Sequence, residues 1–177
     1  MNMNRVHRSL QIRTTLSVAI FFLLQAIFAV APAAEIATGK AEDREVTAFF
    51  RSVEGAFRNK RVQDIVANLH RDFSYIMTYS TDGAFSALES DIAQYRESVT
   101  SFFQSDPEIL DYTILVEGIE RSGEEIKVLA RIKSVVRLNG IVNTCDAASN
   151  YSLLQENGRL IIKDVRGDAT CSNTKIE

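Results

Sequence analysis

The chain of 177 residues contains two cysteines, Cys145 and Cys171. A cysteine can be a nucleophile, a metal ligand, half of a disulfide or a small apolar side chain that fills space. A catalytic thiol requires a nearby base, and beyond the N-terminal segment the chain has one histidine, His70, which we expect at a helix end. One histidine and two cysteines make a poor zinc site. We therefore expect a Cys145–Cys171 disulfide, no metal and no cofactor.

Asp164 and Tyr151 are the leading candidates for acid–base chemistry, because a rigid hairpin register places them opposite each other. A carboxylate that is partly removed from water has a raised pKa and can transfer protons. Asp82, at the end of a predicted strand, is a second candidate carboxylate. The structural alternatives are that Asp164 is solvated or bonded to the Tyr151 hydroxyl, and that Asp82 is a turn residue.

Further polar and aromatic side chains are expected on the inner face of the sheet, beside the small residues Ala130, Ser134 and Ala147. Small residues on a concave face leave volume, and a few convergent polar groups in an apolar cavity are typical of a small-molecule site. The aromatic residues in this set are equally typical of a core. The candidate ligand-binding residues are Tyr75, Met77, Tyr79, Tyr95, Asn143, Ser149, Tyr151 and Asp164.

The elements that position these residues follow from hydrophobic periodicity. Residues 42–60 carry apolar side chains at helical spacing, and residues 62–69 repeat this pattern more briefly. Residues 72–80 alternate with a period of two, which predicts a strand that ends at the Thr81-Asp82-Gly83 turn. Helical spacing returns from Ala84 and ends at Pro107.

The chain after Pro107 is predicted to be sheet, with turn signals at Ser122-Gly123, Asn139-Gly140 and Asn157-Gly158. A two-residue turn at Asn139-Gly140 sets a register that can be tested by whether one face is apolar. The apolar face holds Ile126, Val128, Ala130, Ile132, Val136 and Leu138, and the opposite face holds Lys127, Arg131, Lys133 and Arg137. A slip of one residue would bury the basic set, so the register is well specified.

The last hairpin decides whether the two cysteines meet. A two-residue turn at Asn157-Gly158 leaves Cys145 one position out of register with Cys171. One extra residue in the last strand, as in a β-bulge, brings them opposite each other on the inner face. We predict this bulge at Gly167.

The element order is helix, helix, strand, helix and a four-strand meander, which resembles the cone-shaped α+β fold of the nuclear transport factor 2-like superfamily. That superfamily includes ketosteroid isomerases and SnoaL-type cyclases. The resemblance rests on FFRSVEGAFRNKRVQDIVANLHRDFSYIM (residues 49–77) and on the hairpins from Tyr112 to Val165. It implies one domain over residues 35–177, in which a curved mixed sheet packs on three helices and a pocket lies at the open end of the cone.

The resemblance does not decide the activity, because this fold carries isomerases, cyclases, dehydratases, binding subunits and dimerisation modules. The isomerases of the superfamily pair a tyrosine on the first helix with aspartates on the sheet. The first predicted helix here contains Phe49, Phe50 and Phe57 and no tyrosine. This departure argues against isomerase chemistry.

The N-terminal 34 residues have the composition of a secretory signal peptide. They contain no acid, an apolar run from Leu16 to Ala31, and three arginines, Arg5, Arg8 and Arg13. We expect cleavage near Ala33 and Ala34 and a periplasmic or secreted mature protein. The alternative is a retained membrane anchor, because about 20 apolar residues can span a bilayer.

Cleavage removes three of the 20 Lys+Arg and none of the 23 Asp+Glu, so the net charge changes from −3 to −6 (17 − 23). Nucleic-acid-binding proteins usually carry a basic excess, so we do not expect a nucleic-acid partner. The predicted outer face carries a basic row that could bind an acidic partner or form a homodimer, or that Glu117 and Glu120 could neutralise. This row consists of Lys127, Arg131, Lys133 and Arg137.

Together these observations favour an exported small domain that binds a small apolar ligand or a protein partner and is not a catalyst. After cleavage of the signal peptide we expect no attachment to a membrane. Two alternatives stay open. One is a lyase- or isomerase-type enzyme that uses a pocket carboxylate. The other is an envelope or secretion-system assembly subunit.

Overall fold

The computed structural model describes residues 42–176. The predicted signal peptide and its cleavage point lie outside the described residues. Among the helices that are described, none is long and apolar enough to cross a membrane.

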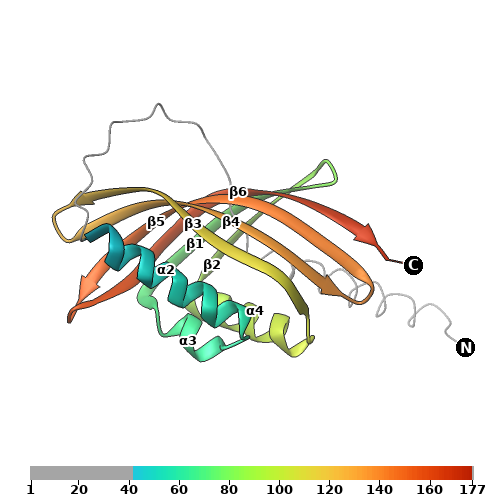
Figure 1. Cartoon of the computed structure of the whole chain (residues 1–177), viewed down its shortest axis with the longest axis horizontal. Helices are drawn as coiled ribbons and strands as arrows, with labels where there is room; N and C mark the ends of the chain where they lie inside the picture. The colour runs from blue at the N-terminus through green and yellow to red at the C-terminus, as the bar shows by residue number, and fades with distance from the viewer. Residues whose placement is uncertain (1–41, 177) are drawn as a thin grey trace, which may run out of the picture.

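Residues 42–176 form three helices and six strands, and the strands make one curved sheet with the helices on its concave side (Figure 1). The sheet order is β2-β1-β6-β5-β4-β3, and β1 and β6 are its parallel pair. The architecture is therefore the predicted α+β cone with a mixed sheet. The elements are α2 (Glu42–Arg58), α3 (Val62–Val66), β1 (Leu69–Thr81), β2 (Ala84–Asp91), α4 (Ile92–Gln104), β3 (Glu108–Ser122), β4 (Glu125–Leu138), β5 (Ile141–Glu156) and β6 (Arg159–Lys175).

The segment Ala84–Asp91 is a strand, whereas its apolar spacing predicted the start of a helix. Asp82 and Gly83 both have positive φ, as in the tight turns that favour hairpins, so the chain returns along β1. Helix α4 begins later because Asp91 caps it. The Asp91 carboxylate accepts from the Ala93 and Gln94 backbone N–H groups at 2.8 and 2.9 Å, and the Gln94 side chain accepts from the Asp91 N–H.

The predicted register of the β4–β5 hairpin is confirmed. Ile126 pairs with Leu153 and Val128 with Tyr151, and Asn139 has the positive φ that a two-residue turn requires. The inner face of β4 is buried as expected, at Ile126, Val128, Ala130, Ile132 and Val136.

The disulfide between Cys145 and Cys171 is present, but the bulge that permits it does not lie at Gly167. The register of β5 and β6 shifts between Ser152 and Leu153, and Lys163 is the extra residue of β6. Ile162 and Val165 explain this position. Both are buried, and two apolar residues three positions apart can share one face only if an extra residue lies between them.

The shifted bulge overturns one prediction about the site. Val165, and not Asp164, lies opposite Tyr151, while Asp164 pairs with Ser152 and points to the outer face. The predicted contact between Asp164 and Tyr151 is therefore wrong.

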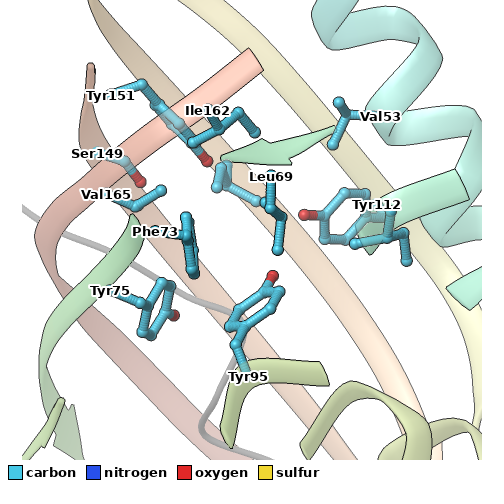
Figure 2. Close-up of a pocket in the computed structure, with 12 residues that line it drawn as sticks. Val53, Leu69, Phe73, Tyr75, Tyr95, Tyr112, Ser149, Tyr151, Ile162 and Val165 are labelled. Atoms are coloured by element: carbon cyan, nitrogen blue, oxygen red, sulfur yellow. The ribbon is translucent and has the colours of Figure 1, made fainter. Parts of the chain in front are cut away.

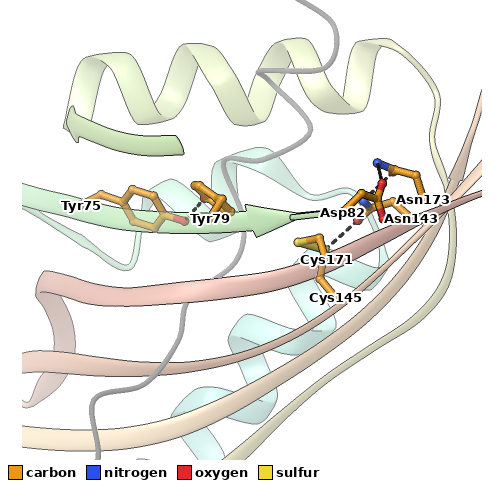
Figure 3. Close-up of a disulfide and its surroundings, with 7 residues drawn as sticks. All are labelled: Tyr75, Tyr79, Asp82, Asn143, Cys145, Cys171 and Asn173. Atoms are coloured by element: carbon orange, nitrogen blue, oxygen red, sulfur yellow. Dashed lines mark hydrogen bonds between the residues drawn. A yellow bond between two sulfur atoms is a disulfide. The ribbon is translucent and has the colours of Figure 1, made fainter. Parts of the chain in front are cut away.

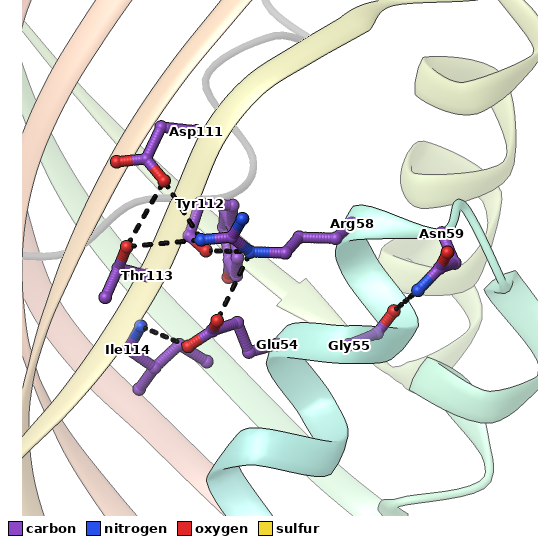
Figure 4. A network of polar contacts seen from close by, with 8 residues as sticks. All are labelled: Glu54, Gly55, Arg58, Asn59, Asp111, Tyr112, Thr113 and Ile114. Carbon is purple, nitrogen blue, oxygen red and sulfur yellow. Dashed lines mark hydrogen bonds and ion pairs between the residues drawn. The ribbon is translucent and has the colours of Figure 1, made fainter.

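Helix α2 covers the free edge of β3 (Figure 4). The Glu54 carboxylate accepts from the Ile114 backbone N–H at 3.0 Å, and Arg58 Nε donates to the Tyr112 carbonyl at 2.6 Å. Arg58 also forms ion pairs with Glu54 at 3.2 Å and with Asp111 at 3.0 Å. These contacts satisfy backbone groups of an edge strand and hold the segment that carries Tyr112 against the helix.

Candidate functional site

A cavity of about 40 Å³ lies between the concave face of the sheet and the helices (Figure 2). All three helices and five of the strands contribute to its wall, so the complete fold is needed to build it. The wall contains no charged side chain among the described residues. Its members are Val53, Ile65, Leu69, Phe73, Tyr75, Tyr95, Tyr112, Ile132, Ser149, Tyr151, Ile162 and Val165.

All five tyrosines of the sequence come together in the cone. Four of them line the cavity, and Figure 2 shows the hydroxyls of Tyr95, Tyr112 and Tyr151 pointing into it from α4, β3 and β5. Tyr79 lies behind the wall, where its hydroxyl forms a 3.0 Å hydrogen bond with that of Tyr75 (Figure 3). The Tyr75 and Tyr95 rings are 5.2 Å apart. Tyr95 is the one tyrosine that is partly exposed.

The tyrosines of the wall are neutral at physiological pH. Burial raises the pKa of Tyr151 to about 12. Burial, and then the neighbouring phenols, raise the pKa of Tyr75 and Tyr95. The pKa of Tyr112 is raised by burial, then by Tyr151 and Tyr95, and last by the Glu54 carboxylate. At neutral pH these side chains therefore carry no charge and can donate or accept hydrogen bonds.

Ser149 adds a hydroxyl to the same wall. Its side chain is fully buried, and the neighbours in register are Ala130 on β4 and Gly167 on β6, which leave space around it. Ser149 lies near enough to lower the pKa of Tyr151, against the larger effect of burial. No described protein group, however, forms a hydrogen bond of good geometry with Ser149 Oγ.

The candidate carboxylates lie elsewhere. Asp164 forms two contacts with the Arg166 guanidinium on the outer face, at 2.7 and 3.2 Å. Asp82 lies in the β1–β2 turn, as its structural alternative stated, and accepts from Asn173 at 3.3 Å. Neither contributes to the cavity wall.

His70 also differs from its predicted place. It belongs to β1 and not to the end of a helix, because the strand begins at Leu69. His70 Nε2 lies 3.2 Å from the Glu156 carboxylate, and Nδ1 accepts from the Asp72 N–H at 3.0 Å. His70 is not part of the cavity wall.

Three other candidates are buried core residues outside the cavity wall, and Figure 3 shows that one of them, Asn143, lies next to the disulfide. Met77 and Tyr79 are buried farther along β1, toward the turn. Asn143 is 1% exposed, donates to Asn173 Oδ1 at 3.0 Å, and places its own Oδ1 2.8 Å from Cys145 Sγ. The sequence predicted the inner face correctly for these residues but not which part of that face is hollow.

The outer basic row is largely neutralised within the sheet. Arg131 contacts Glu117 at 2.8 Å and Asp146 at 3.2 Å. Arg137 contacts Glu108 at 2.6 Å, and Lys127 lies opposite Glu120 in the register. This is the cross-strand balance that was the alternative to a partner site. Dimerisation through this face stays a prediction.

Sequence reasoning missed most of the apolar wall and one polar member, Tyr112. Tyr112 is buried and stacks on Phe57, with ring centroids 4.0 Å apart. The available signal was its spacing of two from Ile114, because both side chains face inward on β3.

No protein-family model matches the chain, and neither does any curated protein sequence. Solved structures do match. A conserved protein from Planctomyces limnophilus is 13% identical with a TM-score of 0.55, and the match covers 77% of this chain and 99% of that protein. The β subunit of a putative aromatic-ring-hydroxylating dioxygenase from Novosphingobium aromaticivorans is 12% identical with a TM-score of 0.55, covering 78% and 92%.

A nuclear transport factor 2-like protein from Cytophaga hutchinsonii is similar over 76% of this chain and 98% of its own length, with 13% identity and a TM-score of 0.50. At these identities the similarity concerns the fold and not the activity. The chain has the nuclear transport factor 2-like fold.

Proposed function

We propose that this protein is an exported, non-catalytic domain that binds a small apolar ligand in the tyrosine-lined cavity. The observation that carries the proposal is the convergence of Tyr95, Tyr112, Tyr151 and the unbonded hydroxyl of Ser149 on one apolar space. An apolar cavity with a few convergent polar groups is the usual form of a small-molecule site.

The chemistry of the wall favours binding over acid–base catalysis. A proton-transfer catalyst works best when its pKa lies near the operating pH. The part of the wall that residues 42–176 form has no carboxylate or histidine side chain, and the pKa of its phenols is raised further from neutrality, to about 12 for Tyr151. Asp164, the carboxylate that an enzyme would have used, is on the other face of the sheet.

The size of the cavity limits the ligand. One water molecule needs about 10–15 Å³ of free space in a cavity. The free volume of about 40 Å³ therefore accommodates roughly three water-sized groups. Sites for drug-sized ligands are about 300–1,000 Å³. The ligand is therefore compact, or it displaces a wall residue, and Tyr95 is best placed to move because it is partly exposed and lies on α4.

Export is supported by the disulfide, since disulfides persist in oxidising compartments. The apolar run of Leu16 to Ala31 with its basic flank supports the same route.

Native mass spectrometry of the protein recovered from its own envelope fraction tests the proposal. We expect a mature chain that begins near residue 35, has lost the two thiol hydrogens, and carries a small molecule that dissociates on activation. A full-length, reduced protein would contradict export. A mature protein that never carries or captures a small molecule would contradict ligand binding.

A further inference from the structure

The polar part of the cavity consists of hydroxyl groups alone, and this composition decides which ligands it can hold. A hydroxyl offers one donor and accepts as well, so it can bind an uncharged oxygen or nitrogen group of a ligand. It supplies no net charge. An ion that enters such an apolar space loses its hydration without a counter-ion, which is far more costly than the transfer of a neutral polar group.

The charged groups beside Tyr112 form an ion pair outside the cavity wall, between Glu54 and Arg58 at 3.2 Å. The Glu54 carboxylate contributes to the raised pKa of Tyr112, after burial and the neighbouring phenols. Glu54 itself is held outside the cavity by the Ile114 N–H and by Arg58 (Figure 4). An anion beside Tyr112 would therefore meet no counter-ion in the wall, because the Arg58 guanidinium is already paired with Glu54 and Asp111.

Ser149 gives the cavity a specific anchor. A buried hydroxyl without a hydrogen-bond partner destabilises a protein, and an alanine would remove that cost with little change of shape. Here the unbonded Oγ faces the cavity on the same strand as Tyr151, two residues away (Figure 2). A ligand oxygen beside these two hydroxyls could hydrogen-bond both of them.

We propose that the Ser149 and Tyr151 hydroxyls together bind the oxygen of a compact uncharged ligand, such as an amide, a ketone or an alcohol, and that the cavity excludes anions. This inference rests on the proposed ligand-binding function and adds the polar anchor and the charge class of the ligand.

The probes are acetamide and acetate, which have nearly the same shape and differ in charge. The readout is the set of ring signals in protein labelled with ¹³C-tyrosine, because all five tyrosines lie in or next to the cavity. At constant ionic strength, acetamide should shift these signals saturably, with a Kd on the order of millimolar for so small a ligand. Acetate should leave them unchanged.

The variants are Ser149→Ala and a matched control, Ser90→Ala. Ser90 is also buried with an unbonded hydroxyl, but it is not part of the wall. Ser149→Ala should weaken acetamide binding by roughly three- to tenfold, the usual effect of one hydrogen bond, while the Tm of the free protein stays the same or rises. Ser90→Ala should leave binding unchanged.

The possible outcomes test the exclusion of anions, the role of Ser149 as an anchor and the binding of acetamide separately. Equal or stronger effects of acetate would overturn the exclusion of anions while ligand binding stands. A lower Tm of Ser149→Ala with unchanged acetamide affinity would show a structural hydroxyl and overturn the anchor. If neither probe moves any tyrosine signal, this inference is wrong, while native mass spectrometry still decides separately whether the protein binds a small apolar ligand.

Discussion

Alkaline pH should unfold this protein through its buried phenols. The pKa of Tyr75, Tyr112 and Tyr151 is raised in the folded protein, mainly by burial, and reaches about 12 for Tyr151. In the unfolded chain each phenol ionises near its ordinary value of about 10. The folded state therefore holds these protons more tightly. Their contribution to stability is complete below about pH 10 and is lost as the pH rises toward 12.

The size of the effect follows from linkage. Each phenol that stays protonated in the fold but ionises in the unfolded chain reduces the free energy of unfolding by about 1.4 kcal/mol per pH unit above 10. At about pH 11 the three buried phenols together remove roughly 4 kcal/mol. A domain of this kind has about 5–15 kcal/mol in total. Tyr95 is left out of this sum because it is partly exposed.

The assay is an ultraviolet titration, with far-ultraviolet circular dichroism measured on the same samples. The sequence has no tryptophan and five tyrosines, four in the cavity wall and Tyr79 bonded to one of them, so the phenolate band reports on this cluster without a tryptophan background. We expect little phenolate at pH 10–11 and then a cooperative rise that coincides with loss of secondary structure. Tyr151→Phe, which removes one of the three phenols, should reduce the loss at pH 11 by about 1.4 kcal/mol. Gradual ionisation near pH 10 with the fold intact would refute the reasoning.

Three further predictions concern the fold. Replacing both Cys145 and Cys171 with alanine should lower the free energy of unfolding in urea by about 3.5 kcal/mol for a loop of 26 residues, and an unchanged midpoint would contradict this. Deleting Lys163 should remove the bulge and keep the disulfide, because every later residue of β6 then moves back by one and a regular hairpin places the two cysteines opposite each other; thiol titration should find no free cysteine, and two free cysteines would contradict the register. Arg58→Ala should lower the free energy of unfolding by about 1 kcal/mol in the same urea assay, because the partly exposed side chain donates a hydrogen bond to the Tyr112 carbonyl of the edge strand. A decrease below about 0.3 kcal/mol would show that this contact does not stabilise the fold.

The sheet was predictable where turn chemistry and alternation agree. The Asn139-Gly140 turn sets the β4–β5 register, and the alternation supports it, since a slip of one residue would bury the basic row. The turn at Asn157-Gly158 leaves Cys145 and Cys171 one position out of register, so a disulfide between them required a bulge. Its position was also present in the sequence, because Ile162 and Val165 cannot both face inward without an extra residue between them, whereas a bulge at Gly167 would bury Asp164 and expose Val165.

The segment Ala84–Asp91 was not predictable from spacing, because Leu88 fits both a helix that continues to Tyr95 and an edge strand. The segment is a strand because the Asp82-Gly83 turn folds it back along β1 and because the cap at Asp91 starts the helix later. These two local signals outweigh the weak helical spacing of the apolar residues.

The cavity itself depended on tertiary structure. Tyr95 and Tyr112 come from elements that are not hydrogen-bonded neighbours, and their meeting depends on how the sheet curves and where α4 lies. Local patterns predict which face of a strand is buried, but not where side chains leave a space between layers. For the same reason the sequence placed Met77 and Asn143 on the inner face, where they are buried, but did not indicate that they lie outside the cavity wall.

The central claim is that the hydroxyl-lined cavity holds a compact uncharged molecule. The most direct measurement is a crystal structure of the protein purified from its own envelope fraction without added ligands. We predict electron density in the cavity for a neutral organic molecule with an oxygen within hydrogen-bond distance of Ser149 Oγ and the Tyr151 hydroxyl. Density for water alone, or for an anion at this place, would contradict the account.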